Sequence, residues 1–145
     1  MTDSTVPLSQ PLYGANIGQA VSRFFRKYAT FSGRASRGEF WWVWVALVLV
    51  NLVLVIVFAF TMSATGTPNE MGGLNPSGAG IAVLVVWGII ELAIIVPTIA
   101  LSVRRLHDAN FAGWWYLLHL TSVGGLVVLV LNLLPSNPTG ARFDR

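Results

Sequence analysis

The clearest pattern along the chain is a series of three long apolar runs separated by short polar segments. The first covers residues 40–62, interrupted by Asn51 and Thr61, and as a helix it would be about 34 Å long against a hydrocarbon core of ~30 Å. Residues 79–103 form a second run of sufficient length, and residues 114–134 form the third. Because helices satisfy their own backbone hydrogen bonds in lipid, the pattern predicts an all-α, polytopic membrane protein with about three transmembrane helices.

The third run is compatible with two arrangements. Gly124 and Gly125 lie at its centre, directly after polar positions, and each half would reach only ~15 Å as a helix. The run therefore either crosses the membrane or turns back within it, in which case the turn must be buried in protein. We expect a crossing, which would place Arg142 and Arg145 on the side opposite to the N-terminus.

The residues before the first run are amphipathic. Small polar residues and two prolines predict a flexible start over residues 1–11. Apolar residues then recur near helical spacing up to Tyr28, with Arg23, Arg26 and Lys27 on a basic edge, which predicts a short helix lying on the membrane surface. The expected organisation is a flexible N-terminus (1–11), an amphipathic, basic segment (12–39), a membrane domain (40–134) with spans at about 40–62, 79–103 and 114–134, and a polar tail (135–145).

The basic residues indicate the orientation of the chain. Five Lys and Arg residues precede the first run, none lies in residues 63–78, and Arg104 and Arg105 separate the second run from the third. Because Lys and Arg are enriched in cytoplasmic loops, the N-terminus is predicted to be cytoplasmic.

The composition agrees with a membrane protein and excludes some classes of function. Hydrophobic residues make up 54 % and charged residues 10 % of the chain, against roughly 25 % charged residues in soluble domains. The absence of cysteine excludes disulfides and thiolate chemistry. The net charge of +3 comes mostly from residues beside the apolar runs instead of one long patch, so no nucleic-acid partner is predicted.

Glu91 is the sharpest candidate for an intramembrane site, because it lies near the centre of the second run. An acidic residue at that depth costs about 3 kcal/mol and by default marks an ion or proton path. The alternative is a hydrogen bond to a neighbouring helix, with Asn51 in the middle of the first run as the partner. Asn51 and Glu91 are therefore a candidate polar site inside the membrane, with either role open.

Two charged clusters flank the first two runs on the predicted cytoplasmic side. Ion pairs between them would tie the helix ends together, which we favour, and binding of the arginines to anionic lipid headgroups is the alternative. No positioned nucleophile, metal-ligand set or cofactor motif accompanies them, so we predict no catalytic, metal or cofactor residue and no enzymatic activity. The candidate structural or headgroup residues are Gly33, Arg34, Arg37, Glu39, Arg104, Arg105, His107 and Asp108.

Two stretches of sequence resemble a known family. Residues 31–41 read Phe-Ser-Gly-Arg-Ala-Ser-Arg-Gly-Glu-Phe-Trp, and residues 104–108 read Arg-Arg-Leu-His-Asp, followed by Gly-Trp-Trp at 113–115. Together they resemble the bacterial family called domain of unknown function 805, over about residues 28–142. The resemblance implies a small inner-membrane protein whose biochemical role is not established, with no inherited catalytic residues. The chain departs from the family pattern at Ser122, where relatives often have proline, and at Ala141 and Asp144 in the tail.

Three hypotheses for function follow from these features. The first is a non-enzymatic interaction or assembly protein, because three short spans enclose little interior and would pack against lipids, a second copy or another membrane protein. The second is a small oligomeric transporter or channel whose copies place Glu91 and Asn51 around a polar path. The third and weakest is an enzyme acting on lipid headgroups. No cofactor is expected.

Overall fold

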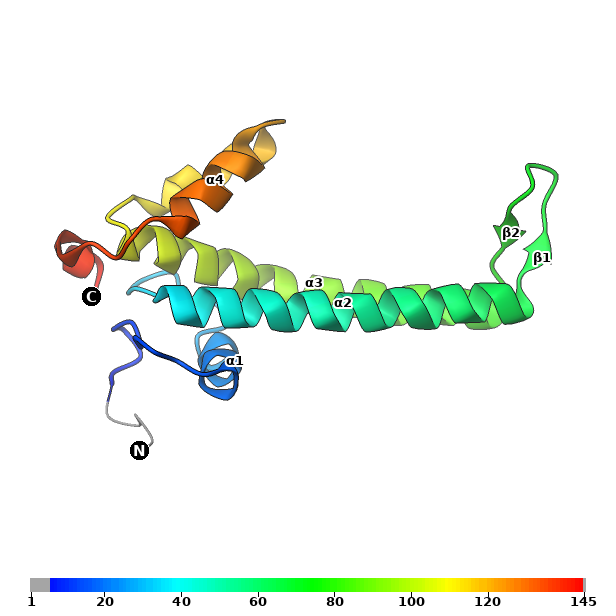
Figure 1. The fold of residues 1–145 in the computed structure, drawn as a ribbon, viewed down its shortest axis with the longest axis horizontal. Helices are drawn as coiled ribbons and strands as arrows, with labels where there is room; N and C mark the ends of the chain where they lie inside the picture. The colour runs from blue at the N-terminus through cyan, green and yellow to red at the C-terminus, as the bar shows by residue number, and fades with distance from the viewer. Residues whose placement is uncertain (1–5, 145) are drawn as a thin grey trace. The chain divides into compact units, whose positions relative to one another are not determined.

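The computed structural model describes residues 6–144, and helices account for most of them. The chain divides into two compact units, Met1–Val45 with Val96–Arg145 as unit 1 and Ala46–Ile95 as unit 2. The all-α membrane class is therefore confirmed. In chain order the elements are α1 (Ile17–Arg26), α2 (Arg37–Thr65), β1 (Thr67–Pro68), β2 (Leu74–Asn75), α3 (Gly78–Asp108), the 3-10 helix η1 (Gly113–Leu120), α4 (Gly124–Leu133) and the 3-10 helix η2 (Pro138–Phe143) (Figure 1).

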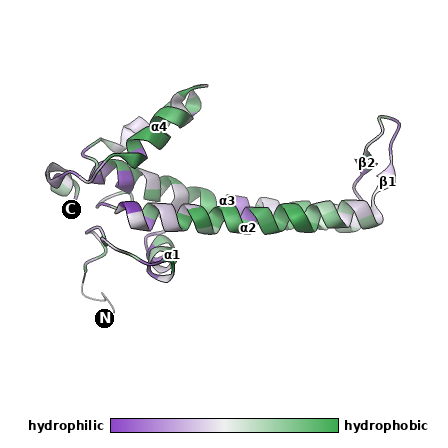
Figure 2. Cartoon of the chain, in the orientation of Figure 1, coloured by the Kyte–Doolittle hydropathy of each residue, from purple (hydrophilic) through white to green (hydrophobic). Residues whose placement is uncertain are grey.

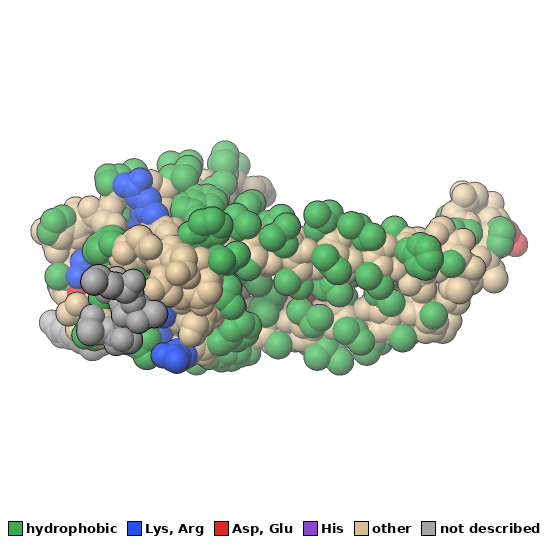
Figure 3. Space-filling model, turned by 60° about the horizontal axis from the view of Figure 1, so that its bottom comes forward, with side chains coloured by type: hydrophobic (Ala, Val, Ile, Leu, Met, Phe, Trp, Pro, Cys, Tyr) green, Lys and Arg blue, Asp and Glu red, His purple; other side chains and the backbone are tan. Residues whose placement is uncertain are grey.

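Unit 2 consists of the apolar parts of α2 and α3 and the connection between them. The two helices are 29 and 31 residues long, and both are long and apolar enough to cross a membrane. Most residues along both helices are hydrophobic (Figure 2), and many hydrophobic side chains are exposed on their surface (Figure 3). The polar segment between the first two apolar runs contains a two-residue antiparallel pairing of β1 with β2. Unit 2 thus presents an apolar surface that suits lipid or another protein.

α1 begins at a capping box. The side chain of Asn16 accepts a hydrogen bond from the backbone N–H of Gln19, and the Gln19 side chain accepts one from the Asn16 backbone. The predicted basic edge requires correction, because Arg23 and Lys27 are buried within unit 1 and only Arg26 is exposed. The exposed face of this segment includes Ile17, Phe25 and Tyr28. An apolar exposed face is typical of a helix that lies in a membrane interface.

The third apolar run differs from the expected crossing helix. Its two halves are η1 and α4, which pack against each other and reverse direction between them (Figure 1). The halves approach so closely that a Cβ added at Gly124 would lie 1.6 Å from the carbonyl oxygen of Leu118. Gly113 at the start of the run contacts Val103, and the carbonyl of Leu134 at its end accepts a hydrogen bond from Arg105. Both ends therefore meet α3 at its C-terminal end, and the run turns back.

The N-terminal residues that the structure describes are held in place. Gln10 donates a backbone hydrogen bond to Pro7, and Arg23 donates to the carbonyls of Val6, Pro7 and Gln10. The flexible start expected over residues 1–11 stays a prediction for residues 1–5, which, like Arg145, lie outside the described residues.

The C-terminal end of α3 forms the core of unit 1. Residues 100–109 are all buried, and the largest fully buried side chains of the described chain are those of Arg104 and Arg105. A core built around arginines requires partners for each guanidinium, because an unpaired buried charge is strongly destabilising.

Candidate functional site

The first carboxylate of the site is Glu39, in the first turn of α2, which is 2 % exposed. Its Oε1 accepts a hydrogen bond from Arg23 Nε at 2.5 Å, and its Oε2 accepts one from the backbone N–H of Leu12 at 3.0 Å and of Ser36 at 2.9 Å. Ser36 Oγ in turn donates to the Leu12 carbonyl. All these contacts fasten the N-terminal segment to the beginning of α2.

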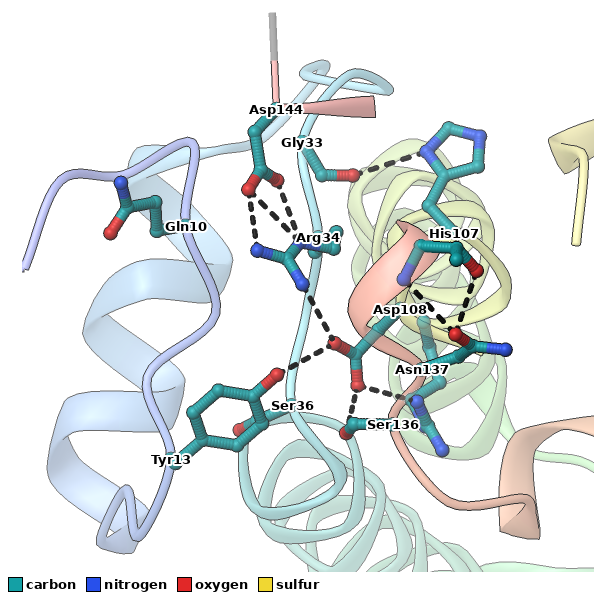
Figure 4. Close-up of polar contacts among 12 residues, drawn as sticks. Gln10, Tyr13, Gly33, Arg34, Ser36, His107, Asp108, Ser136, Asn137 and Asp144 are labelled. Carbon is teal, nitrogen blue, oxygen red and sulfur yellow. Dashed lines mark hydrogen bonds and ion pairs between the residues drawn. The ribbon is translucent and has the colours of Figure 1, made fainter. Parts of the chain in front are cut away.

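The second carboxylate is Asp108, the last residue of α3, which is fully buried. Its Oδ1 accepts a hydrogen bond from the Tyr13 hydroxyl at 3.1 Å, and its Oδ2 accepts hydrogen bonds from Arg105 at 2.8 Å and from Ser136 Oγ (Figure 4). Arg34 Nη1 lies 4.0 Å from Oδ1. One carboxylate thus joins the N-terminal segment, the 27–36 loop, α3 and the tail.

Arg34 connects this carboxylate to the C-terminal tail. Its Nη2 lies 2.6 Å from Asp144 Oδ2 and its Nε lies 2.9 Å from Oδ1, a two-point pairing (Figure 4). The hydrogen bonds to Asp144 raise the pKa of Arg34 above its ordinary value. The backbone N–H of Gly33 also donates to the carbonyl of Phe143 at 2.8 Å. The tail is therefore part of the site.

Arg104 and Arg105 bind the carbonyl ends of two different helices. Arg104 Nη1 donates to the carbonyls of Lys27 at 2.9 Å and Thr30 at 2.8 Å, just after α1, and Arg105 Nε donates to the carbonyl of Asn132 at 3.0 Å in the last turn of α4. The last carbonyls of a helix have no partner inside it and carry the negative end of its dipole. The two arginines therefore dock α1 and α4 onto α3.

His107 and Asp108 do not form an acid–base pair. His107 Nδ1 lies 3.1 Å from the carbonyl oxygen of Gly33, and its ring stacks on Phe143 with centroids 4.1 Å apart. Because a carbonyl oxygen only accepts hydrogen bonds, Nδ1 carries the proton of the neutral ring, and Nε2 is the nitrogen without a proton. Gly33 itself has φ +80°, and a Cβ added there would lie 2.6 Å from the Ser9 carbonyl, so a larger residue does not fit.

The candidate site inside the membrane lies in unit 2. Trp87 Nε1 donates to Asn51 Oδ1 at 3.1 Å and to Glu91 Oε1 at 3.3 Å, and Asn51 Nδ2 donates to the carbonyl of Leu47 at 3.2 Å. The side chains of Asn51 and Glu91, which the sequence paired, thus meet through Trp87. The sequence signal for Trp87 is its position four residues before Glu91, on the same face of a helix.

The structure brings most of the predicted residues of unit 1 together. Among the candidate residues Arg37 is exposed, whereas the others make the contacts described above. Within residues 6–144 no group of three or more His, Cys, Asp or Glu side chains could hold a metal ion. The sequence candidates did not include Tyr13, Arg23, Ser136 and Asp144. We name the set Tyr13, Arg23, Arg34, Glu39, Arg104, Arg105, Asp108, Ser136 and Asp144 the charged cluster.

Comparison with known proteins agrees with this architecture. The chain is 32 % identical over 122 residues to the inner membrane protein YhaH of Escherichia coli K12, covering 83 % of this chain and 89 % of the relative, and the YhaH protein of the O157:H7 strain matches equally. No solved structure matches. These relatives support a location in the inner membrane. The model of the family described as protein of unknown function DUF805 matches residues 28–145, and the chain belongs to that family.

Proposed function

We propose that the protein is a non-enzymatic assembly protein of the inner membrane, which packs unit 2 against a second copy or another membrane protein. The observation that carries this proposal is the polar trio of Asn51, Trp87 and Glu91, which lies in the apolar part of two long helices and is only half-buried by them. Polar groups that face hydrocarbon are costly, so a packing partner over this part of unit 2 would be stabilising.

The charged cluster supports a structural role for the other end of the helices. Each oxygen of Glu39 and of Asp108 accepts at least one hydrogen bond within the chain. A carboxylate that is saturated in this way is poorly placed to act as a general acid or base. The five basic residues that precede the first apolar run favour a cytoplasmic N-terminus, and the cluster would then form the cytoplasmic base of the assembly.

Oligomeric state in lipid tests this proposal. Single-cysteine variants are straightforward because the chain has no native cysteine. Donor- and acceptor-labelled copies in dilute proteoliposomes are expected to show energy transfer that survives addition of lipid. Gly88→Leu adds bulk one turn from Glu91 where nothing lies within 4 Å of a new Cβ, and it should weaken association without disturbing the monomer.

Gly78→Leu is the matched control for Gly88→Leu. Gly78 also has open space around a new Cβ, but it lies at the first residue of α3, far along the helix from the polar trio. We expect energy transfer to be unchanged in this variant. A strictly monomeric protein in lipid, without any co-purifying membrane protein, would refute the proposal.

A second candidate function, a small oligomeric transporter, is favoured by the half-buried carboxyl of Glu91 in the middle of α3. If several copies surround a polar path, Glu91→Gln should abolish proton or ion flux in liposomes. Glu70→Gln, in the exposed connection between the strands, is the matched control. Equal flux in liposomes with and without protein would exclude this function.

A further inference from the structure

A pocket lies beside the charged cluster, and His107 is one of the residues that line it. Its volume is about 510 Å³, and it is lined by Ser32, His107, Ala112, Arg142 and Phe143. These residues come from the 27–36 loop, the end of α3, the segment after α3, and η2. The pocket therefore forms only when the tail docks on α3.

Arg142 supplies the positive charge of the pocket. It is exposed, its guanidinium lies 4.7 Å from the centroid of the Phe143 ring, and its Nη2 donates to the carbonyl of Asn110 at 3.3 Å. Within residues 6–144 no carboxylate pairs with Arg142, because Asp108 and Asp144 are engaged by Arg34 and Arg105. A guanidinium has five N–H donors, so Arg142 retains donors for a ligand.

Two further groups of the pocket can hydrogen-bond to a polar ligand. Ser32 contributes an exposed hydroxyl, and His107 contributes Nε2, the ring nitrogen on the side away from Gly33 (Figure 4). The His107 ring is held between its hydrogen bond to Gly33 and the stack on Phe143. Burial and the nearby Arg142 lower the pKa of His107. The neutral ring, with its proton on Nδ1, therefore presents Nε2 as an acceptor for a hydroxyl group of a ligand.

The depth of the pocket points to lipid as the source of the anion. His107 follows Val103, where the long apolar run of α3 ends, by four residues, which corresponds to about 6 Å along a helix. The headgroup layer on each side of the hydrocarbon core is roughly 5–8 Å thick. Ala112 and Phe143 add apolar walls that would contact the glycerol part of a phospholipid.

We propose that this pocket binds a phospholipid headgroup, with Arg142 and Ser32 as donors to the phosphate and His107 Nε2 as an acceptor for a headgroup hydroxyl. The same chemistry would recognise a free phosphate, so the test must separate the two sources. A lipid bound at this position would contact the tail and would therefore stabilise the arrangement in which the tail is docked on α3.

The test is a calorimetric titration of the purified protein in a maltoside detergent, which carries no phosphate, with dioctanoyl phosphatidylglycerol. Arg142→Gln is expected to weaken binding by roughly 10- to 100-fold, the range for loss of a charge-assisted hydrogen bond. Arg142→Lys retains the charge and should recover part of the affinity. Arg26→Gln removes an exposed arginine outside the pocket and is the matched control.

Each outcome decides between the alternatives. Binding of the phospholipid, no binding of dioctanoylglycerol, and loss of affinity in Arg142→Gln alone would support the proposal. Competition by inorganic phosphate at similar concentration would overturn the lipid source and assign the pocket to free phosphate. Equal losses in Arg142→Gln and Arg26→Gln would mean diffuse attraction to the surface, and no binding to the native chain would overturn the site itself. An unchanged thermal midpoint in Arg142→Gln ensures that folding is not the cause.

Discussion

Replacing Lys27 by methionine should stabilise the protein. Lys27 follows α1 and is 2 % exposed, and its Nζ donates a long hydrogen bond to the carbonyl of Arg34, at 3.5 Å. Burial lowers its pKa from 10.5 to about 8, and repulsion from Arg104 and Arg23 acts in the same direction, whereas attraction to Glu39 opposes it. The charge on Lys27 therefore lowers the stability of the folded state, and an apolar side chain of similar length removes this effect.

The size and sign of the effect follow from the pKa. Because one pKa unit corresponds to about 1.4 kcal/mol, the charged form of Lys27 costs at most about 3 kcal/mol of folding free energy. The folded state has the lower pKa, so the unfolded state binds the proton more tightly. The cost is complete below pH 8 and disappears as the pH rises from about 8 to 10.5. The long hydrogen bond to Arg34 offsets little of the gain.

Thermal unfolding in detergent, followed by tryptophan fluorescence, measures this effect. Lys27→Met should gain about 1–3 kcal/mol at pH 7, or roughly 3–9 °C in the midpoint for a chain of this size. The difference from the native chain should shrink between pH 8 and 10.5. Arg26→Met, the exposed neighbour, should change the stability by less than about 0.5 kcal/mol. A lower midpoint for Lys27→Met at pH 7, or a gain independent of pH, would refute the reasoning.

Three further predictions concern the packing of unit 1. Gly124→Ala should lower the thermal midpoint strongly, because the new Cβ would lie 1.6 Å from a backbone oxygen. Gly125→Ala should leave the midpoint nearly unchanged, because the atom nearest to its Cβ would lie 3.8 Å away. Similar midpoints for the two variants would contradict the close packing of η1 and α4. Asp108→Asn should cost about 3–5 kcal/mol by leaving buried Arg105 without its carboxylate, and an unchanged unfolding midpoint would argue against the ion pair. Cysteines at exposed Ser22 and Ala141 should react with a membrane-impermeant reagent from the same side, and labelling from opposite sides would mean that the third run crosses.

The sequence predicted the members of the charged cluster that flank the first two apolar runs, but not those in the N-terminal segment and the tail. Arg105 and Asp108 are three residues apart on one helix, so their pairing follows from helical spacing. Tyr13 lies 95 residues from Asp108, and Arg34 lies 110 residues from Asp144. No local pattern specifies such pairs, because they depend on which segments the fold brings together.

The amphipathic pattern of α1 shows the same limit. Periodicity identified a helix with one basic side and one apolar side, but it does not say which side faces protein. In a soluble domain the apolar side would be buried, whereas here Arg23 and Lys27 turn inward and Ile17 and Phe25 are exposed. Ala20 and Phe24 are buried as well, so the buried face of α1 is mixed, and the carboxylate of Glu39 pairs with the Arg23 side chain on that face.

The sequence by itself determined that this is a helical membrane protein. The free energy of transferring an apolar run from water to lipid is a sum over the residues of that run, so it does not depend on the rest of the fold. Whether residues 114–134 cross or turn back was decided by tertiary structure. The two halves of this run pack closely at Gly124, and Arg105 holds the end of α4 by its carbonyls. The hydrogen bond from Arg105 to Asn132 joins residues 27 positions apart in the chain, so only the folded arrangement determines it.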